Sequence, residues 1–452
     1  MDIFIDFSFL TSLVGGNFLL LFRQLFIYLF FLFFIYWIIK IIWQSRVSYA
    51  KDIFLAEQQY ILLSINVPRD NEQGPEAVER FFANLAAIKV NPTWFEKNIQ
   101  GVSQLDISLE IISKNGQIEY LIYAPVHYRD MIEASIYAIY PGVEISESED
   151  YTLGSPEEFP DKEDDLWGAD LGLYNKNPLP IRTYPDFEHG LSKELKDPMT
   201  GLLEILGKLL PGEQTWIQFI IRPAGSALKK EGSSLIKSIS GEKSDSSDNL
   251  FDKTLKIPVK ISQIIGDLFL DIFGFFNPSG EVDKKEKKPV SPENHKIIEA
   301  IQKKISKIAF ETRIRVIYLA KKEIFSKDRG VIGILGAFNA INTLDLNGIE
   351  IEKKVFDSLK RPQKTESSKE SILKAYKKRS LYWQIKPKGM GRILTNLAKF
   401  LAIKIGGNKK KNILNIEELA TLYHFPVITG RVPLIKKTGS KRGEPPFALP
   451  IK

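Results

Sequence analysis

The chain has 452 residues, of which 44% are hydrophobic and 26% charged, and its formal net charge is +7. This length allows two or three globular domains. Cysteine is absent, which excludes disulfides, thiol nucleophiles and zinc–thiolate sites.

A membrane anchor is predicted over residues 1–46. Residues 24–43 are almost wholly apolar, which is about the length that crosses a hydrocarbon core of roughly 30 Å, and Tyr36, Trp37 and Trp43 stand toward one end. A buried core helix and a signal peptide cleaved after Ala50 are the two alternatives. Because Lys40, Arg46 and Lys51 follow or end the span, the positive-inside rule places the N-terminus outside and residues 47–452 in the cytoplasm.

A ferredoxin-like α+β domain is predicted over residues 47–150. Residues 60–67 indicate a strand, and the stretch after Gly74-Pro75 repeats apolar residues at helical spacing. Two alternating runs, 104–113 and 117–124, flank Asn115-Gly116, which is a strong hairpin signal. A helix over 128–140 and a strand over 143–145 complete the order βαββαβ.

An acidic linker is predicted next, over residues 151–196. From Glu144 to Asp170 the chain has eleven acidic residues and one basic residue, with Pro156 and Pro160 among them. This composition is typical of a solvated loop.

A second, less complete α+β unit is predicted over residues 197–352, packed beside the first. Its expected elements are a helix over 199–210, a strand over 214–222, a helix over 292–310, a strand over 313–320 and a helix near 331–341. Residues 214–222 are apolar on both faces of the strand, which indicates burial on both faces.

A Ser-, Lys- and Gly-rich insertion, which is predicted to be mobile at both ends, occupies residues 224–289 of this unit. Within it, residues 257–276 have the pattern of an amphipathic helix, whose apolar face includes Leu268, Phe269 and Phe273. This face is a candidate for docking a partner, for docking on its own domain, or for lying on a membrane. Acidic residues on the polar face argue against anionic lipid.

A basic segment follows at residues 353–411, with eighteen basic and three acidic residues. Bases interleaved with aromatic residues suit nucleic acid, whereas a basic face beside the acidic inner leaflet is the equally weighted alternative. The candidate contact residues are Lys374, Lys377, Lys378, Arg379, Trp383, Lys386, Lys388, Lys409, Lys410 and Lys411.

No catalytic, cofactor-binding or metal-binding residue is predicted. The tail carries Lys437-Thr438-Gly439-Ser440-Lys441, but the glycine spacing of a phosphate loop is missing and Pro445-Pro446 cannot begin the required helix. The four histidines stand singly in the sequence: His127, His189, His295, His424. Neither a G-x-S-x-G elbow nor a dinucleotide fingerprint occurs.

Four stretches in order carry a family resemblance: "EASIYAIYPGVEISESEDY", "LPIRTYPDF", "DPMTGLLEILGKLLPGEQTWIQFIIRP" and "ILNIEELATLYHFP" ahead of "EPPFALP". Together they resemble the membrane-anchored N-terminal region, a domain of unknown function, of conjugation or type IV secretion-like ATPases from candidate-phyla bacteria. In the fused relatives the last stretch leads into a motor domain with a phosphate loop. This chain ends at about that junction, so the resemblance implies an anchor without its motor.

The C-terminal helix and Pro-rich tail, residues 412–452, offer a further candidate docking surface, with a core helix as the favoured alternative: Leu414, Leu419, Leu422, Phe425. The first hypothesis for the whole chain is a non-catalytic inner-membrane scaffold or adaptor of a DNA or protein transfer system, which recruits a separately encoded phosphate-loop ATPase. The second is a membrane-tethered nucleic-acid-binding protein that uses residues 353–411. DNA and a second copy of the chain are therefore the other partners considered.

Overall fold

The structure is a computed structural model that describes residues 17–68, 71–159, 161–187, 197–240, 292–352, 362–381 and 411–426. These residues form one nine-stranded sheet with every pair of strands antiparallel. Eight strands follow one another in the order β4-β1-β3-β2-β6-β7-β5-β8, and β9 pairs with β7. The predicted α+β class is confirmed.

The first unit has the ferredoxin-like topology that the sequence predicts. Its elements are β1 (Tyr60–Asn66), α3 (Pro75–Leu85), β2 (Ile107–Lys114), β3 (Gln117–Pro125), α4 (Arg129–Tyr137) and β4 (Glu144–Glu147), and the strand order is β4-β1-β3-β2. The β2–β3 turn has φ 55° at Asn115 and φ 81° at Gly116. Positive φ at both positions is what an Asn-Gly hairpin turn requires.

The second unit repeats this topology in full. Its elements are β5 (Asp164–Leu173), α5 (Thr200–Gly207), β6 (Glu213–Pro223), β7 (Ala309–Lys321), α9 (Gly333–Asn339) and β8 (Ile349–Ile351), in the strand order β8-β5-β7-β6. The first strand of this unit, β5, lies in the stretch predicted to be an acidic linker. That prediction is wrong for residues 164–173, because β5 pairs with β7 on one side and β8 on the other and buries alternate apolar side chains.

The two units share one sheet because β2 and β6 lie side by side. Eight residue pairs join them, from Ile107 opposite Ile221 to Lys114 opposite Gln214. Each unit contributes its own edge strand to this junction. Read along the sheet, the strand order of the second unit is therefore the reverse of the order in the first. The long insertion joins β6 to β7, the equivalent of the short β2–β3 hairpin in the first unit.

Two helices stand at the base of that insertion: α6 (Ala227–Ile239), which the sequence did not predict, and α8 (Pro292–Ser306). They pack closely, since a Cβ at Gly232 would lie 2.6 Å from Cγ2 of Ile305. The predicted helix over 292–310 ends earlier because Ala309 and Phe310 already belong to β7. The amphipathic stretch 257–276 lies outside the described residues.

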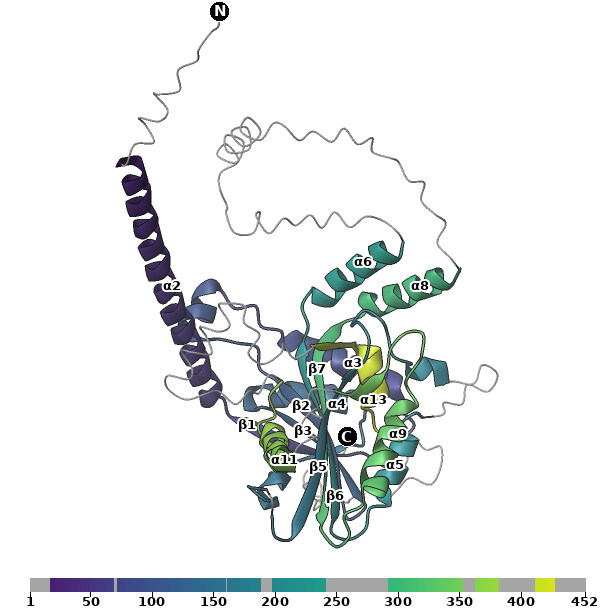
Figure 1. Cartoon of the computed structure of the whole chain (residues 1–452). Coiled ribbons are helices and arrows are strands. Elements are labelled where there is room, and N and C mark those ends of the chain that lie inside the picture. The colour runs from purple at the N-terminus through teal and green to yellow at the C-terminus, as the bar shows by residue number, and fades with distance from the viewer. Residues whose placement is uncertain are drawn as a thin grey trace, which may run out of the picture.

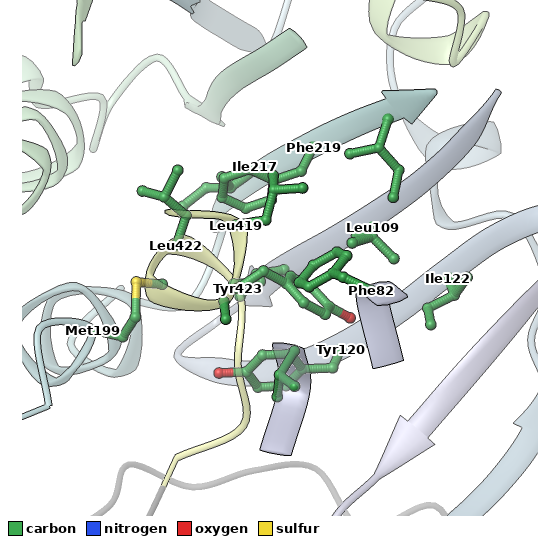
Figure 2. Close-up of a cluster of buried hydrophobic side chains, with 14 of the residues drawn as sticks. Phe82, Leu109, Tyr120, Ile122, Met199, Ile217, Phe219, Leu419, Leu422 and Tyr423 are labelled. Atoms are coloured by element: carbon green, nitrogen blue, oxygen red, sulfur yellow. The ribbon is translucent and has the colours of Figure 1, made fainter. Parts of the chain in front are cut away.

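One face of the sheet, here called the helical face, is covered by α3, α4, α5, α9 and α13 (Ile416–Leu422), which follows β9 (Asn412–Asn415). Figure 2 shows the centre of this face, where the α13 region meets the strands: Leu419, Leu422, Tyr423, Leu109, Ile217, Phe219. The opposite face carries α11 (Pro362–Lys377), and Figure 1 shows α11 on the other side of the strands from α5 and α9. Ile372, Leu373 and Tyr376 pack there against Ile112, Trp216 and Ile317.

A single helix, α2 (Asn17–Glu57), projects from the sheet (Figure 1). The part from Leu25 is long and apolar enough to cross a membrane. Its apolar side chains are exposed, from Leu25 at 56% to Ile42 at 62%, so it is not a core helix here. Only Gln58 and Gln59 separate α2 from β1.

Short turns complete the described fold. They are η1 (Ala86–Ile88), η2 (Glu96–Gln100), η3 (Val126–Tyr128), η4 (Tyr151–Gly154), η5 (Tyr184–Phe187) and η6 (Asp328–Ile332).

Candidate functional site

Charged side chains gather in the middle of the sheet, on the face that α11 covers. Glu110 on β2 lies opposite Gln218 on β6, Gln218 lies opposite Arg315 on β7, and Arg315 lies opposite Asp170 on β5. These four residues, here called the polar row, therefore cross four neighbouring strands in one line. Each is at most 2% exposed. Because side chains alternate between faces along a strand, their apolar neighbours point to the helical face.

The polar row is internally paired. Arg315 Nε lies 2.7 Å from Asp170 Oδ1, and Arg313 Nη1 lies 2.8 Å from Asp170 Oδ2. Gln218 Nε2 donates to Glu110 Oε1 over 2.9 Å, and Ser108 Oγ donates to the same oxygen over 2.7 Å. Buried charges are tolerated where each finds an opposite charge or a hydrogen bond, and this row meets that condition.

Arg379 lies two residues after the end of α11 and covers the Glu110 end of the polar row. Its Nε lies 2.8 Å from Glu110 Oε1, and its Nη1 lies 2.7 Å from Asp150 Oδ2, just before η4. Its guanidinium carbon also lies 4.5 Å from the ring centroid of Tyr123. Arg379 has φ 44°, a left-handed conformation that a non-glycine residue adopts at a cost. One side chain thus joins three segments that are far apart in sequence.

The backbone around Arg379 is fixed by the same row. Arg315 Nη1 donates to the carbonyl oxygen of Ala375 over 2.6 Å, and Arg313 Nε donates to that of Leu381 over 2.7 Å. Tyr151 donates from its hydroxyl to Glu110 Oε2 over 2.8 Å and lies 2.7 Å from the hydroxyl of Tyr376. The C-terminal part of α11 is therefore held to the sheet by polar contacts as well as apolar ones.

Electrostatics keeps these groups in fixed protonation states. Burial opposes the charge on Arg379, but Glu110 and Asp150 outweigh it and raise the pKa of the guanidinium. Burial also opposes ionisation of Asp150, yet the hydrogen bond and charge of Arg379 hold the pKa of this carboxyl below its usual range. Burial, with the charge of Glu110 as the next cause, raises the pKa of Tyr151 and of Tyr376 well above that of a free phenol. At neutral pH Asp150 and Arg379 are therefore ionised and the phenols of Tyr151 and Tyr376 are neutral.

This arrangement is suited to holding α11 in place. Its carboxylates already accept from arginines, and its side chains are closed to solvent. Throughout the described ranges, no group of three or more His, Asp or Glu side chains is placed to hold a metal ion. We therefore identify the polar row and Arg379 as a structural clamp on α11.

Buried polar contacts between side chains also fix α13. Lys304 Nζ lies 2.9 Å from Glu418 Oε1 with both side chains fully buried, and His424 Nε2 lies 2.9 Å from Asp197 Oδ1. Asn415 caps the helix: its side chain accepts from the backbone N–H of Glu418, whose carboxylate accepts from the N–H of Asn415. This reciprocal pattern is a capping box.

The predicted docking residues on and beside this helix lie in the core. They are between 0% and 4% exposed: Leu414, Leu419, Leu422, Phe425. The docking interpretation is therefore corrected to its alternative, a core helix on the helical face. The other predicted docking residues, Leu268, Phe269 and Phe273, lie outside the described residues.

The predicted basic contact residues are distributed over different environments. Arg379 is buried in the clamp, Lys374 pairs with Glu370, and Lys411 Nζ lies 3.0 Å from Glu311 Oε1. Lys377 is half-buried and Lys378 is exposed. The remaining five lie outside the described residues: Trp383, Lys386, Lys388, Lys409, Lys410. Arg379 in particular is not available to a phosphate, which corrects its assignment as a nucleic-acid contact.

Sequence reasoning missed the polar row because its members are spread from Glu110 to Arg379. One local signal was present. Glu110, Gln218 and Arg315 each stand between two apolar residues inside a strand. A charged or amide residue at such a position needs a buried partner.

Comparison with protein families gives one informative match. The model described as "Domain of unknown function (DUF8128)" matches residues 50–347. The matched region begins near the end of α2 and includes both ferredoxin-like units up to the residues before β8. It contains all four residues of the polar row, whereas Arg379 and α13 lie beyond it. No curated protein matches the chain.

Proposed function

We propose that this chain, which belongs to the DUF8128 family, is a non-catalytic scaffold anchored in a bacterial inner membrane by one span. Its N-terminus lies outside and its sheet in the cytoplasm. It recruits a separately encoded phosphate-loop ATPase that drives DNA or protein transfer of the conjugation or type IV secretion kind. The motor half of this proposal rests on the resemblance described above.

The observation that carries the proposal is α2. This helix contains the apolar span and then continues to Glu57, and two residues separate its end from the first strand. The fourteen residues after Trp43 form a stalk of about 21 Å at 1.5 Å per residue. A helix of this kind supports a sheet held close to, but clear of, a membrane surface.

The non-catalytic part of the proposal is supported by the clamp. Perturbed ionisable groups often mark active sites, but ion-pair networks that serve structure perturb pKa values as well. The polar row concentrates buried charge in the described ranges, and its groups are closed by Arg379 and α11.

The test is reconstitution. The full chain, purified in detergent, is mixed with a phosphate-loop ATPase from the same bacterium, and complex formation and ATP hydrolysis are measured separately. We expect a stable complex, hydrolysis only when the ATPase is present, and loss of the complex for an unrelated anchored protein of similar charge. ATP hydrolysis by the chain alone contradicts the proposal.

The same preparation tests the nucleic-acid alternative. DNA retained at low salt and released as salt rises, with retention lost when Lys386, Lys388, Lys409 and Lys410 are replaced by Glu, favours that second reading. The matched control replaces four lysines outside residues 353–411 by Glu, which changes the net charge equally but leaves the basic segment intact: Lys162, Lys208, Lys229, Lys230. Size measurement of the detergent complex tests whether the chain also binds a second copy of itself.

A further inference from the structure

Two large aromatic side chains are exposed together on the segment between α3 and β2. Trp94 is 66% exposed and Phe95 is 56% exposed. They lie at the start of the turn η2, within residues 89–106, and this segment packs against α2 rather than against the sheet alone. Adjacent exposed aromatics on a folded segment call for a partner surface.

The position of this pair along α2 is fixed by three contacts. The ring of Trp94 stacks on that of Trp43, with centroids 6.0 Å apart and an interplanar angle of 17°. Arg46 Nη1 donates to the carbonyl oxygen of Asn98 over 3.3 Å. Gly101 has φ 76°, and a Cβ there would lie 2.3 Å from the carbonyl carbon of Ala50. The segment therefore touches the stalk at two levels, near Trp43 and near Ala50.

The turn that carries the pair is held by its own hydrogen bonds. Thr93 N–H donates to Glu96 Oε2 over 2.7 Å, and the N–H of Glu96 donates back to Thr93 Oγ1 over 3.3 Å. Asn98 Nδ2 donates to the carbonyl oxygen of Trp94 over 2.9 Å. The exposure of Trp94 and Phe95 is thus a feature of an ordered turn.

Trp94 lies beside the end of the apolar span of α2. Trp43 is the last residue of the run that begins at residue 24, and tryptophan favours the boundary between hydrocarbon and water. Trp94 stacks directly on it. Basic residues of α2 flank this level at Lys40 and Arg46, and Lys97 of the turn is exposed. Aromatics beside lysine and arginine are the composition that binds an anionic membrane interface.

We propose that Trp94 and Phe95 insert into the headgroup region of the bilayer that α2 spans, as a second membrane contact. This inference rests on the proposed anchor. The occupant is lipid because the exposed pair is continuous with the aromatic end of the span and lies at the level of three cations, Lys97 on the turn and Lys40 and Arg46 on α2. A domain attached through α2 alone can swing about its stalk. A second contact, joined to the sheet through β2, fixes the angle between sheet and membrane.

Spin labels on single cysteines test this, and the chain has no cysteine of its own. The full chain is placed in vesicles of phosphatidylethanolamine and phosphatidylglycerol, and each label is tested for collision with oxygen, which partitions into lipid, and with a water-soluble nickel complex. The variants are Phe95→Cys, with Lys97→Cys on the same turn as a second site. Gln100→Cys is the matched control: it is also exposed, but it adjoins Gly101 and so lies near Ala50, about 10 Å farther along the stalk. Phe34→Cys reports whether α2 itself is in the bilayer.

The expected result is that oxygen collides more than nickel at positions 34 and 95, that position 97 is intermediate, and that nickel collides more at position 100. A label at 95 that behaves like the one at 100, while 34 is buried in lipid, overturns the second contact and leaves the anchor intact. A label at 95 shielded from both reagents also overturns it, because a protein surface then covers the pair. A label at 34 that meets nickel freely overturns the anchor and this inference together.

Discussion

The two faces of the central sheet are built from the same strands by different means. On the helical face, five helices bury apolar side chains, and the stabilisation is shared among many contacts. On the other face, a row of buried ions and amides is closed by one arginine from a distant segment. The difference teaches that the helical face makes the fold stable, while the polar row fixes where one helix, α11, sits.

The largest effect is expected for Arg379→Met. Removing this side chain leaves Glu110 fully buried without its cation, which costs about 3–5 kcal/mol of the free energy of unfolding. Urea denaturation followed by circular dichroism measures it, with the exposed neighbour Lys378→Met as control at about 0.5 kcal/mol or less. Adding Glu110→Gln to Arg379→Met should recover part of the loss. If Arg379→Met and Lys378→Met lost the same free energy of unfolding, Arg379 would not stabilise the polar row.

A somewhat smaller and more local effect is expected on the helical face for Leu419→Ala. The side chain is fully buried, and such truncations cost about 2–5 kcal/mol through lost burial and the cavity left behind. Because apolar contacts have no fixed partner, Leu419→Met should cost less than about 1.5 kcal/mol. Thermal denaturation of both variants measures the contrast. If Leu419→Met lost as much stability as Leu419→Ala, packing on the helical face would depend on the exact side chain, as pairing in the polar row does.

The pair between Asp150 and Arg379 should also respond to acid. The folded pKa of Asp150 is lowered by Arg379, so its stabilisation is present above the ordinary pKa of about 3.9 and is lost as pH falls through the lower folded value. The stability difference between the wild type and Asp150→Asn should therefore shrink below about pH 4. Glu149→Gln, at the exposed neighbouring carboxyl, is the matched control and should show no such convergence. A difference that stays constant through this range would contradict the ion pair.

The smallest effect is expected for Asn415→Ala at the start of α13. The substitution removes the side chain that accepts from Glu418 N–H, which costs about 1 kcal/mol. Asn415→Asp keeps an acceptor and should lose less. Chemical denaturation of the two variants distinguishes loss of the cap from general disturbance of the helical face; equal losses would argue against a capping role.

The helical face was largely predictable from the sequence, whereas the polar row was not. Apolar periodicity and the Asn115-Gly116 turn are local, so the first unit followed from the sequence alone. Strand β5 was missed for two reasons. Its first residues, Asp164 and Asp165, are acidic and lie partly exposed at the end of the strand. Asp170 is paired with Arg313 and Arg315, which are more than 140 residues away in the sequence. Arg379 was assigned to a basic surface for the same reason: its partners are visible only in three dimensions.

The central claim, that α2 spans a membrane and holds the sheet on the cytoplasmic side, is tested most directly by labelling single cysteines in intact spheroplasts with a maleimide that cannot cross membranes. Leu153→Cys reports on the sheet, since this side chain is 81% exposed, and Asp6→Cys reports on the N-terminus. We predict that position 6 is labelled in intact spheroplasts and that position 153 is labelled only after lysis. Labelling of position 153 before lysis would contradict the claim.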